Sequence, residues 1–274
     1  MNDTIQKLRS IDLREVTLER VCEAIKKRVL DVPDRLAWNI ETELTSFNRA
    51  KLQAYKDQYR NRRCFVIGNG PSLKNMDLSL LQNEITLGSN RIYLLSNEHP
   101  HIPTYLASID TLLLDQFHQD ISRVSIPKFI NWKLRKHFRE SPDVAFLNIN
   151  YTPHFGKDIT RPLWGGHTVT YVCLQVAFYM GFKEVILIGV DHNYGQQGVP
   201  NQDITAAGGD QNHFCPNYYT KGHQWRIPDY KGAELAYSMA RREFEKDNRI
   251  VLDATINGKL HVFKKVNYES LFKG

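Results

Sequence analysis

The chain has 274 residues, 42% hydrophobic and 24% charged, a composition typical of a globular protein with a buried core rather than of a disordered one. Its four cysteines show neither CxxC nor paired spacing, which argues against a zinc site and a disulfide framework. The net charge of +6 is spread along the chain without a recognition motif, so it favours anionic small molecules or membrane surfaces over nucleic acid.

Residues 1–60 are predicted to form a helical N-terminal extension. Apolar residues recur there at helical spacing, at Leu18, Val21, Cys22, Ile25 and Val29. Pro33 ends this pattern, and a second helical stretch is expected from about Trp38 to Arg60. Because the N-terminus has no signal-peptide segment and the apolar runs are too short to cross a bilayer, we expect a cytoplasmic protein. A peripheral position at the inner face of the membrane stays open, as does a homo-oligomer.

From Arg63 onward, short apolar runs alternate with helical segments. The predicted strands are 64–67, 85–88, 104–108, 128–130, 144–147, 185–190 and 250–253, and the clearest helices are 168–180 and 231–246. Apolar runs that stop at a glycine or a polar residue are typical of buried parallel strands. Their alternation with helices predicts an α/β fold with a Rossmann-like, mostly parallel sheet and helices on both faces. Residues 61–274 would form one nucleotide-binding catalytic domain, with a lid at about 195–230.

The turn after the first strand is the leading candidate for a phosphate site. It reads Gly68, Asn69, Gly70, Pro71 and Ser72. Two glycines let backbone amides approach a ligand closely, and a helix beginning at the proline would favour negative charge. The turn matches neither GxGxxG nor a Walker loop. An ordinary strand-to-helix turn, with Ser72 as a helix cap, is the alternative.

Further polar residues follow the other predicted strands. Asn90 and Arg91 come after the second strand, Asp110 after the third, and Asp191 after the strongest one. Because such sheets bind ligands at the carboxyl ends of their strands, we expect these residues to meet the turn at 68–72 in one crevice. Asn90 suits a base or ribose edge, Arg91 a phosphate, and Asp191 a sugar hydroxyl. Tyr194 would donate to a phosphate or a leaving oxygen.

The stretch from Asp210 to Trp225 concentrates histidines, aromatic residues and amides in an irregular segment, which suggests a lid. His213 and His223 are the candidates for a general base toward an acceptor hydroxyl, although a structural role for each stays open. No spacing joins His192 to these two as a metal site. No required metal is predicted, but Asp110 and Asp191 are the carboxylates that would hold Mg²⁺ in phosphate chemistry.

Several of these motifs together carry a resemblance that covers about residues 60–272. The runs RCFVIGNGPSLKNMDLSLL, ITLGSNRIYL, MGFKEVILIGVDHNYG and DQNHFCPNYY resemble the bacterial family DUF115, labelled 6-hydroxymethylpterin diphosphokinase MptE-like. They are also similar to a region of the Maf proteins that glycosylate flagellin and, more distantly, to small bacterial sialyltransferases that use CMP-sialic acid without a metal. That last resemblance implies that Asn69, Ser72 and Asn90 bind the CMP moiety, and Asp191 matches the aspartate of its GIDFY-type segment.

This chain departs from the sialyltransferase pattern in two places. Asn193 stands at the position of the tyrosine that assists the departing phosphate, with Tyr194 one place later. The lid histidine of that family aligns with neither His213 nor His223 in particular. The donor and the acceptor therefore stay open.

Three functions follow from these patterns. The first is a glycosyltransferase that moves a sugar, such as a nonulosonic acid, from a CMP- or other nucleotide-linked donor to a glycan or lipid-linked acceptor of polysaccharide biosynthesis. The second is an MptE-type diphosphokinase that uses ATP and Mg²⁺. The third is a non-catalytic nucleotide-binding protein of a polysaccharide cluster.

Overall fold

The computed structural model describes residues 22, 26, 28–138, 142–193 and 198–273. The contacts divide the chain into two compact units, Met1–Thr45 and Ser46–Gly274. Tyr194 lies outside the described residues, as do most positions of the first predicted helix. Residues 46–60, predicted as part of the N-terminal extension, belong to the same unit as the sheet.

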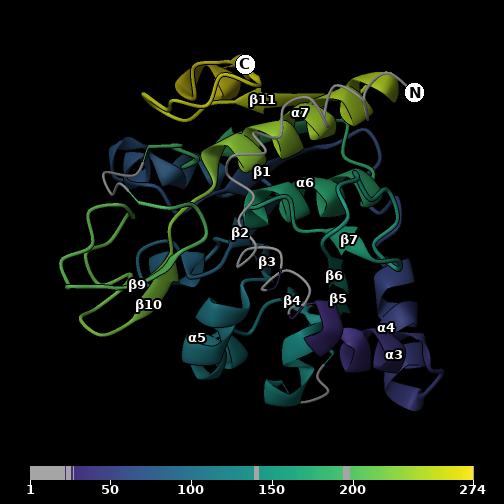
Figure 1. Ribbon diagram of the computed structural model, residues 1–274. Helices are drawn as coiled ribbons and strands as arrows, with labels where there is room; N and C mark the ends of the chain where they lie inside the picture. The colour runs from purple at the N-terminus through teal and green to yellow at the C-terminus, as the bar shows by residue number, and fades with distance from the viewer. Residues whose placement is uncertain (1–21, 23–25, 27, 139–141, 194–197, 274) are drawn as a thin grey trace. The chain divides into compact units, whose positions relative to one another are not determined.

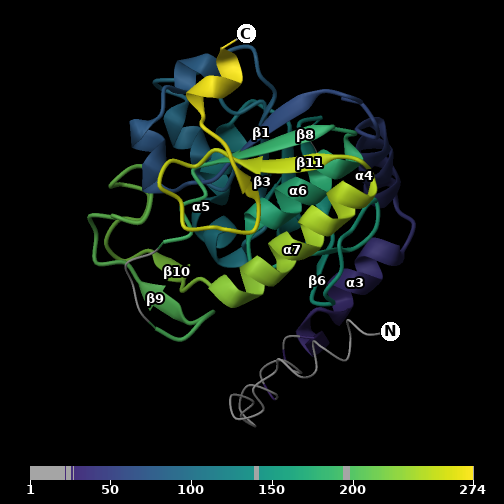
Figure 2. The same ribbon diagram turned by 90° about the horizontal axis from the view of Figure 1, so that it is seen from above.

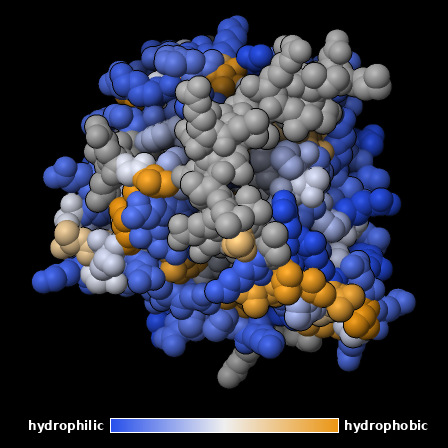
Figure 3. All heavy atoms as spheres, in the orientation of Figure 1, coloured by the Kyte–Doolittle hydropathy of each residue, from blue (hydrophilic) through white to orange (hydrophobic). Residues whose placement is uncertain are grey.

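The first unit contains the helix α3 (Val32–Asn39), which begins where Pro33 was expected to end a helix. Pro33 occupies the first turn of α3, where its missing N–H costs no hydrogen bond. Trp38 therefore lies near the end of α3 and does not start a new helix. Several large apolar side chains of the first unit are exposed: Val29, Leu30, Val32, Leu36 and Ile40. On the face of the molecule drawn in Figure 3, hydrophobic residues interrupt a mainly hydrophilic surface.

The helix α4 (Glu43–Ala54) starts at a capping arrangement and stops well before its predicted end. Thr42 Oγ1 accepts the N–H of Thr45 at 3.2 Å, and Thr45 Oγ1 accepts the N–H of Thr42 at 2.8 Å, so both ends of this turn are satisfied. Beyond α4 the backbone turns at Asp57, which has a φ of 55°. The Asp57 N–H donates to the carbonyl of Tyr179 at 3.0 Å, a tertiary bond that replaces the next helical one.

An eight-stranded sheet forms the centre of the second unit, and all of its paired strands are parallel. Its strands are β1 (Arg63–Ile67), β2 (Thr86–Ser89), β3 (Tyr105–Ser108), β4 (Lys128–Asn131), β5 (Val144–Leu147), β8 (Glu184–Ile188), β11 (Ile250–Asp253) and β12 (Lys264–Lys265). Their order across the sheet is β12-β11-β8-β1-β2-β3-β4-β5. The seven predicted strands are confirmed, and β12 is an addition to them.

Helices cover both faces of this sheet, which confirms the Rossmann-like α/β class (Figures 1 and 2). The α-helices that follow α4 along the chain are α5 (Thr111–Arg123), α6 (Val169–Tyr179) and α7 (Tyr230–Lys246). The 3-10 helices are η2 (Pro71–Asn75), η3 (Leu78–Leu81), η4 (Ile92–Leu95), η5 (Trp132–His137) and η6 (Glu269–Phe272). The helices α6 and α7 pack on each other. No helix in the described parts of the chain has the length and apolar character needed to cross a membrane.

The core is built around β1, β8 and α6, whose side chains are almost all inaccessible to solvent. Cys64 in β1 and Cys173 in α6 are fully buried, as expected for small apolar side chains, and burial raises the pKa of the Cys173 thiol to about 12. The buried side-chain amide of Gln175 in α6 forms hydrogen bonds through both its oxygen and its nitrogen. Gln175 accepts the N–H of Gly156 at 2.8 Å and donates to the carbonyl of Trp164 at 2.9 Å, which ties the loop before α6 to that helix.

Candidate functional site at the carboxyl edge of the sheet

The strand order of the sheet reverses between β1 and β8. From β1 the chain proceeds through β2 to β5 on one side, and it then returns to form β8 on the other side of β1. The segments that leave the carboxyl ends of β1 and β8 therefore run in opposite directions. In open α/β sheets such a point is where ligands bind. The edge where the parallel strands end is called the carboxyl edge below.

The turn at residues 68–72 packs directly against Asp191, which follows β8. The Asp191 carboxylate accepts the Ser72 N–H at 3.0 Å through Oδ1 and the Ser72 hydroxyl at 2.7 Å through Oδ2. Burial raises the pKa of Asp191, and the hydrogen bonds from Ser72 oppose that shift. Gly70 takes the N-cap position of η2, so Ser72 lies inside this short helix and is not its cap.

Most hydrogen-bond donors of this turn are already used by the protein. The Gly68 N–H donates to Ile188 O at 2.8 Å, and the Gly70 N–H donates to Gly189 O at 2.9 Å. The Asn69 amide donates to the Ser89 carbonyl at 3.0 Å and to its hydroxyl at 2.8 Å. Phosphate binding by residues 68–72 stays a prediction.

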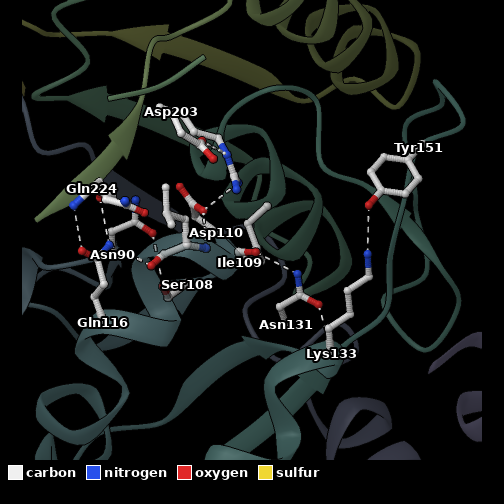
Figure 4. A network of polar contacts seen from close by, with 12 residues as sticks. Asn90, Ser108, Ile109, Asp110, Gln116, Asn131, Lys133, Tyr151, Asp203 and Gln224 are labelled. Carbon is white, nitrogen blue, oxygen red and sulfur yellow. Dashed lines mark hydrogen bonds and ion pairs between the residues drawn. The ribbon is translucent and has the colours of Figure 1, made fainter. Parts of the chain in front are cut away.

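The ends of β2 and β3 bring Asn90 and Asp110 to the same edge (Figure 4). Asn90 has a φ of 53°, a conformation that asparagine tolerates better than most residues. Its Oδ1 accepts the Ser108 hydroxyl at 3.2 Å. Asp110 caps α5 by accepting the Leu112 N–H at 2.9 Å and also accepts from Arg226 at 3.2 Å. The carboxyl edge thus carries amide and carboxylate groups from β1, β2, β3 and β8.

The described part of the predicted lid, residues 198–230, includes an antiparallel hairpin of β9 (Asp203–Thr205) and β10 (Gln224–Arg226). The Arg226 guanidinium bonds Asp203 at 2.7 Å within the hairpin and Asp110 at the carboxyl edge. Gln116 of α5 donates to the carbonyl of Gln224 and accepts its N–H, both at 2.8 Å. Figure 4 shows these contacts joining the hairpin to the end of β3.

Arg91 holds a second part of the lid in place. Only 7% of this residue is exposed, and its guanidinium lies 3.8 Å from the ring centroid of Phe117. It donates to the carbonyls of Asn217 and Tyr218. The phosphate role predicted for Arg91 would require these bonds to be exchanged.

The two candidate bases both lie in the lid, in different surroundings. His213 Nδ1 is 2.7 Å from Asp210 Oδ2, and the imidazole stacks on Tyr218 with centroids 3.9 Å apart. Burial pushes the pKa of Asp210 upward, but the hydrogen bond and charge of His213 outweigh it, so that pKa lies below its ordinary value. His223 instead uses Nδ1 to accept the Thr220 N–H at 3.1 Å.

Two further histidines at this edge received no role from the sequence. His192 directly follows Asp191, and its Nε2 lies 3.0 Å from Glu234 Oε1. His167 precedes α6, and its Nδ1 lies 3.1 Å from Asp229, whose pKa that bond lowers to about 2. The sequence could have pointed to them because one follows a strand and the other precedes a helix. It could not have shown their carboxylate partners, which lie in α7 or directly before it and are far away along the chain.

Within the described residues, no group of three or more His, Cys, Asp or Glu side chains is arranged to hold a metal ion. The two carboxylates considered for Mg²⁺ are each engaged by protein donors, Asp110 by Arg226 and Asp191 by Ser72. As arranged, these side chains do not fit a Mg²⁺ site.

A parallel sheet with a reversal of strand order and polar side chains at its carboxyl edge defines a Rossmann-like α/β protein. Within that class, the chain belongs to the family described as 6-hydroxymethylpterin diphosphokinase MptE-like, whose model matches residues 38–197. Membership of a family named after a diphosphokinase indicates a transferase and leaves the transferred group open.

One solved structure that the comparison matches to this chain is the MAf glycosyltransferase from Magnetospirillum magneticum AMB-1, with 15% sequence identity and a TM-score of 0.49. The similarity covers 91% of this chain and 42% of that chain, so this chain spans less than half of its length. A comparison with curated proteins finds no match.

Proposed function

We propose that this protein is a glycosyltransferase that binds a nucleotide-linked sugar at the carboxyl edge and transfers the sugar to a hydroxyl of a bacterial surface-glycan acceptor. A CMP-linked nonulosonic acid is the donor that we favour. The observation that carries the proposal is the gathering of Asn69, Asn90 and Asp191 around the point where strand order reverses, beside a lid bonded to Asp110.

The proposed chemistry needs a base, an acceptor for sugar hydroxyls and a positive charge near the phosphate. His213 would remove the proton of the attacking hydroxyl, with Asp210 orienting its ring as a carboxylate orients histidine in other acyl and group transfers. The acceptor oxygen would bond to the anomeric carbon as the bond to the nucleotide phosphate breaks. Arg226 would exchange Asp110 for that phosphate, because guanidinium groups bind phosphate oxygens well.

Binding of the nucleotide tests this proposal before any donor sugar is known. Melting temperatures would be measured with CMP, CDP, UDP, GDP and ATP, each with and without Mg²⁺, since a ligand of the folded state raises the melting temperature. A shift with CMP that needs no metal, followed by release of CMP from a CMP-sugar in the presence of acceptor, is the expected result. No shift with any of the five nucleotides would refute the proposal.

The second candidate is diphosphoryl transfer from ATP, which the family match favours because residues 38–197 include the turn at 68–72, Asp110 and Asp191. In that case only ATP with Mg²⁺ would raise the melting temperature, and AMP would accumulate during turnover. AMP release without sugar transfer would replace the glycosyltransferase proposal by this one.

A further inference from the structure

Two neighbouring residues after β8 turn their side chains to different partners. Asp191 contacts the segment after β1, where its carboxylate accepts from Ser72. His192 contacts the first turns of α7: its Nε2 lies 3.0 Å from Glu234 Oε1, and its ring meets that of Tyr230 edge-on, with centroids 4.6 Å apart. The φ of His192 is 54°. Residues with side chains keep this left-handed conformation where surrounding contacts hold them, and such residues are concentrated at binding sites.

The partner of His192 determines the position of its ring hydrogen. Burial lowers the pKa of His192, and the hydrogen bond from its ring to Glu234 opposes this shift. Two further charges act in opposite directions, since Asp253 raises the pKa and His261 lowers it. The imidazole is therefore neutral at pH 7 and carries one ring hydrogen. Because a carboxylate can only accept, that hydrogen lies on Nε2, and Nδ1 is left as an acceptor.

The Nδ1 acceptor of His192 has no hydrogen-bond partner in the part of the chain that the structure describes. Only 10% of the side chain is exposed, and the contacts with Glu234 and Tyr230 hold the ring in one orientation. An acceptor that is fixed in direction and unpaired within the protein suits a ligand that supplies a hydrogen. An ionised phosphate has no hydrogen to supply, whereas a hydroxyl group does.

We propose that His192 Nδ1 accepts a hydrogen bond from a hydroxyl group of the transferred sugar, so that the sugar lies at the end of β8, beside α7. This inference rests on the proposed function. The nucleotide candidates Asn69 and Asn90 follow β1 and β2, which lie on one side of β8 in the sheet. A donor that binds across the reversal of strand order therefore has its nucleoside near these asparagines and its sugar near His192.

His192 and His213 then have different tasks in different places. The lid segment of His213 is bonded to the turn after β1, because the Phe214 N–H donates to the Asn69 carbonyl at 2.9 Å. As the base, His213 acts on the attacking hydroxyl, whereas His192 holds the sugar before the reaction. Loss of His192 should therefore raise the KM for the donor, and loss of His213 should lower kcat.

Isothermal titration of the full chain with CMP and with CMP-N-acetylneuraminic acid separates the sugar from the nucleotide. If the melting panel selects UDP or GDP, that nucleotide and UDP-glucose or GDP-mannose replace them. The variant is His192→Phe, which keeps an aromatic ring against Tyr230 but has no acceptor. Its affinity for the nucleotide sugar should fall roughly 3- to 10-fold, while its affinity for the nucleotide stays within about twofold of the wild type.

The matched control is His118→Phe, which makes the same change at an exposed histidine of α5. It should bind both ligands as the wild type does. The ratio of the two affinities within one variant cancels any general weakening of the fold, and a melting curve for each variant monitors that weakening.

Nitrogen NMR of the histidine rings gives a second readout, which a change in packing alone would not produce. In the free protein at pH 7.5, the ring of His192, assigned with His192→Phe, should carry its hydrogen on Nε2. The nucleotide sugar should shift the Nδ1 resonance, because that nitrogen gains a hydrogen bond, and the nucleotide alone should leave it in place.

Two results would overturn the inference and leave the proposed function intact. The first is an unmoved Nδ1 resonance when the nucleotide sugar is bound. The second is an equal change of affinity for nucleotide and nucleotide sugar in His192→Phe. Absence of a melting shift with every nucleotide of the panel, or a shift with ATP and Mg²⁺ alone, would refute the proposed function and this inference together.

Discussion

The carboxylate of Asp191 fills the space into which any side chain at residue 70 would project. A Cβ on Gly70 would lie 1.7 Å from Asp191 Oδ2 and 2.8 Å from Gly189 O. The φ of Gly70 is −71°, so the requirement for glycine here is one of space and not of backbone conformation. The two segments at the reversal of strand order therefore fit together only without a side chain at this position.

Gly70→Ala should destabilise the fold by roughly 2–4 kcal/mol, because the turn and Asp191 must move apart. Urea unfolding followed by circular dichroism measures this loss. Gly165→Ala is the control, since a Cβ there meets nothing closer than Ile149 Cγ2 at 3.3 Å. The control should lose less than about 1 kcal/mol, and equal losses in both variants would contradict the close packing of Gly70.

Asp191→Asn should keep the fold and weaken nucleotide binding. The asparagine oxygen can still accept the Ser72 N–H, and its amide can donate to the Ser72 hydroxyl oxygen, so the unfolding free energy should change by less than about 1 kcal/mol. Nucleotide affinity should fall, because the ligand loses a charged acceptor. Asp191→Ala removes both bonds and should cost about 1–3 kcal/mol in the same unfolding measurement. Unimpaired nucleotide binding in Asp191→Asn would remove this residue from the site.

Arg226→Met should loosen the lid without unfolding the protein. Arg226 is 38% exposed, and ion pairs with such exposure contribute at most about 1 kcal/mol each. Faster hydrogen–deuterium exchange is expected in the hairpin of residues 203–226, because its bonds to Asp203 and Asp110 are lost. Arg123→Met removes a surface pair with Asp120 and should leave that exchange unchanged. Equal exchange in both variants would mean that Arg226 does not secure the lid.

Asp229→Asn should reveal a pH-dependent contribution to stability. The pKa of Asp229 is about 2 in the folded protein and about 3.9 in an unfolded chain, so its ionised form stabilises the fold above that range. At pH 7 the substitution should lower the unfolding free energy by roughly 2 kcal/mol. This loss should shrink as the pH falls from about 4 toward 2, where both states become protonated.

The control for this experiment is Asp120→Asn, whose carboxylate is 47% exposed and pairs with Arg123 at 3.4 Å. Its effect should stay below about 1 kcal/mol at pH 7. Urea unfolding at several pH values measures both variants. A loss in Asp229→Asn that is equally large near pH 2 and pH 7 would disprove the role given to the pair with His167.

His213→Ala should slow turnover roughly 10²-fold or more if His213 is the base, and added imidazole should restore part of it. His223→Ala should change the rate by only a few-fold, because the Nδ1 of His223 accepts the Thr220 N–H and its neutral ring therefore carries the proton on Nε2, with no ring nitrogen left to accept another. Nucleotide release under saturating donor measures both rates. Rescue by imidazole separates a lost base from a distorted lid. A slower His223→Ala variant with imidazole rescue would assign the base to His223 instead.

The strands could be predicted from the sequence because each one is formed by a short run of residues that are adjacent in the chain. Residues 64–67 and 185–188 are continuous apolar runs, since both faces of a parallel strand are covered, and both strands appear at these positions. The helix 168–180 has the same local origin. The predicted extent of the second helix to residue 60 was wrong, because a tertiary hydrogen bond from Asp57 to Tyr179 competes with the next helical turn.

For the candidate site, the sequence predicted which residues share one edge of the sheet, but not which groups they bond. Asn69, Asn90, Asp110 and Asp191 all follow strands, and parallel strands end at one edge, so their common location follows from the pattern. Their partners did not follow from it. Arg91 reads as a free cation in the sequence, yet the lid, more than a hundred residues away, supplies the carbonyls that it bonds.

The sequence by itself therefore determined the strands, the α/β class and the polar residues at the carboxyl edge, because hydrophobic burial and strand polarity act over a few residues. The tertiary structure alone decided the strand order, the addition of β12, the anchoring of the lid and the direction of each hydrogen bond. Those features depend on contacts between distant segments, such as Ser72 with Asp191 and Arg226 with Asp110. Hydrogen-bond donors and acceptors find their partners only when such segments meet, so the sequence could not predict that Asp191 accepts both the N–H and the hydroxyl of Ser72.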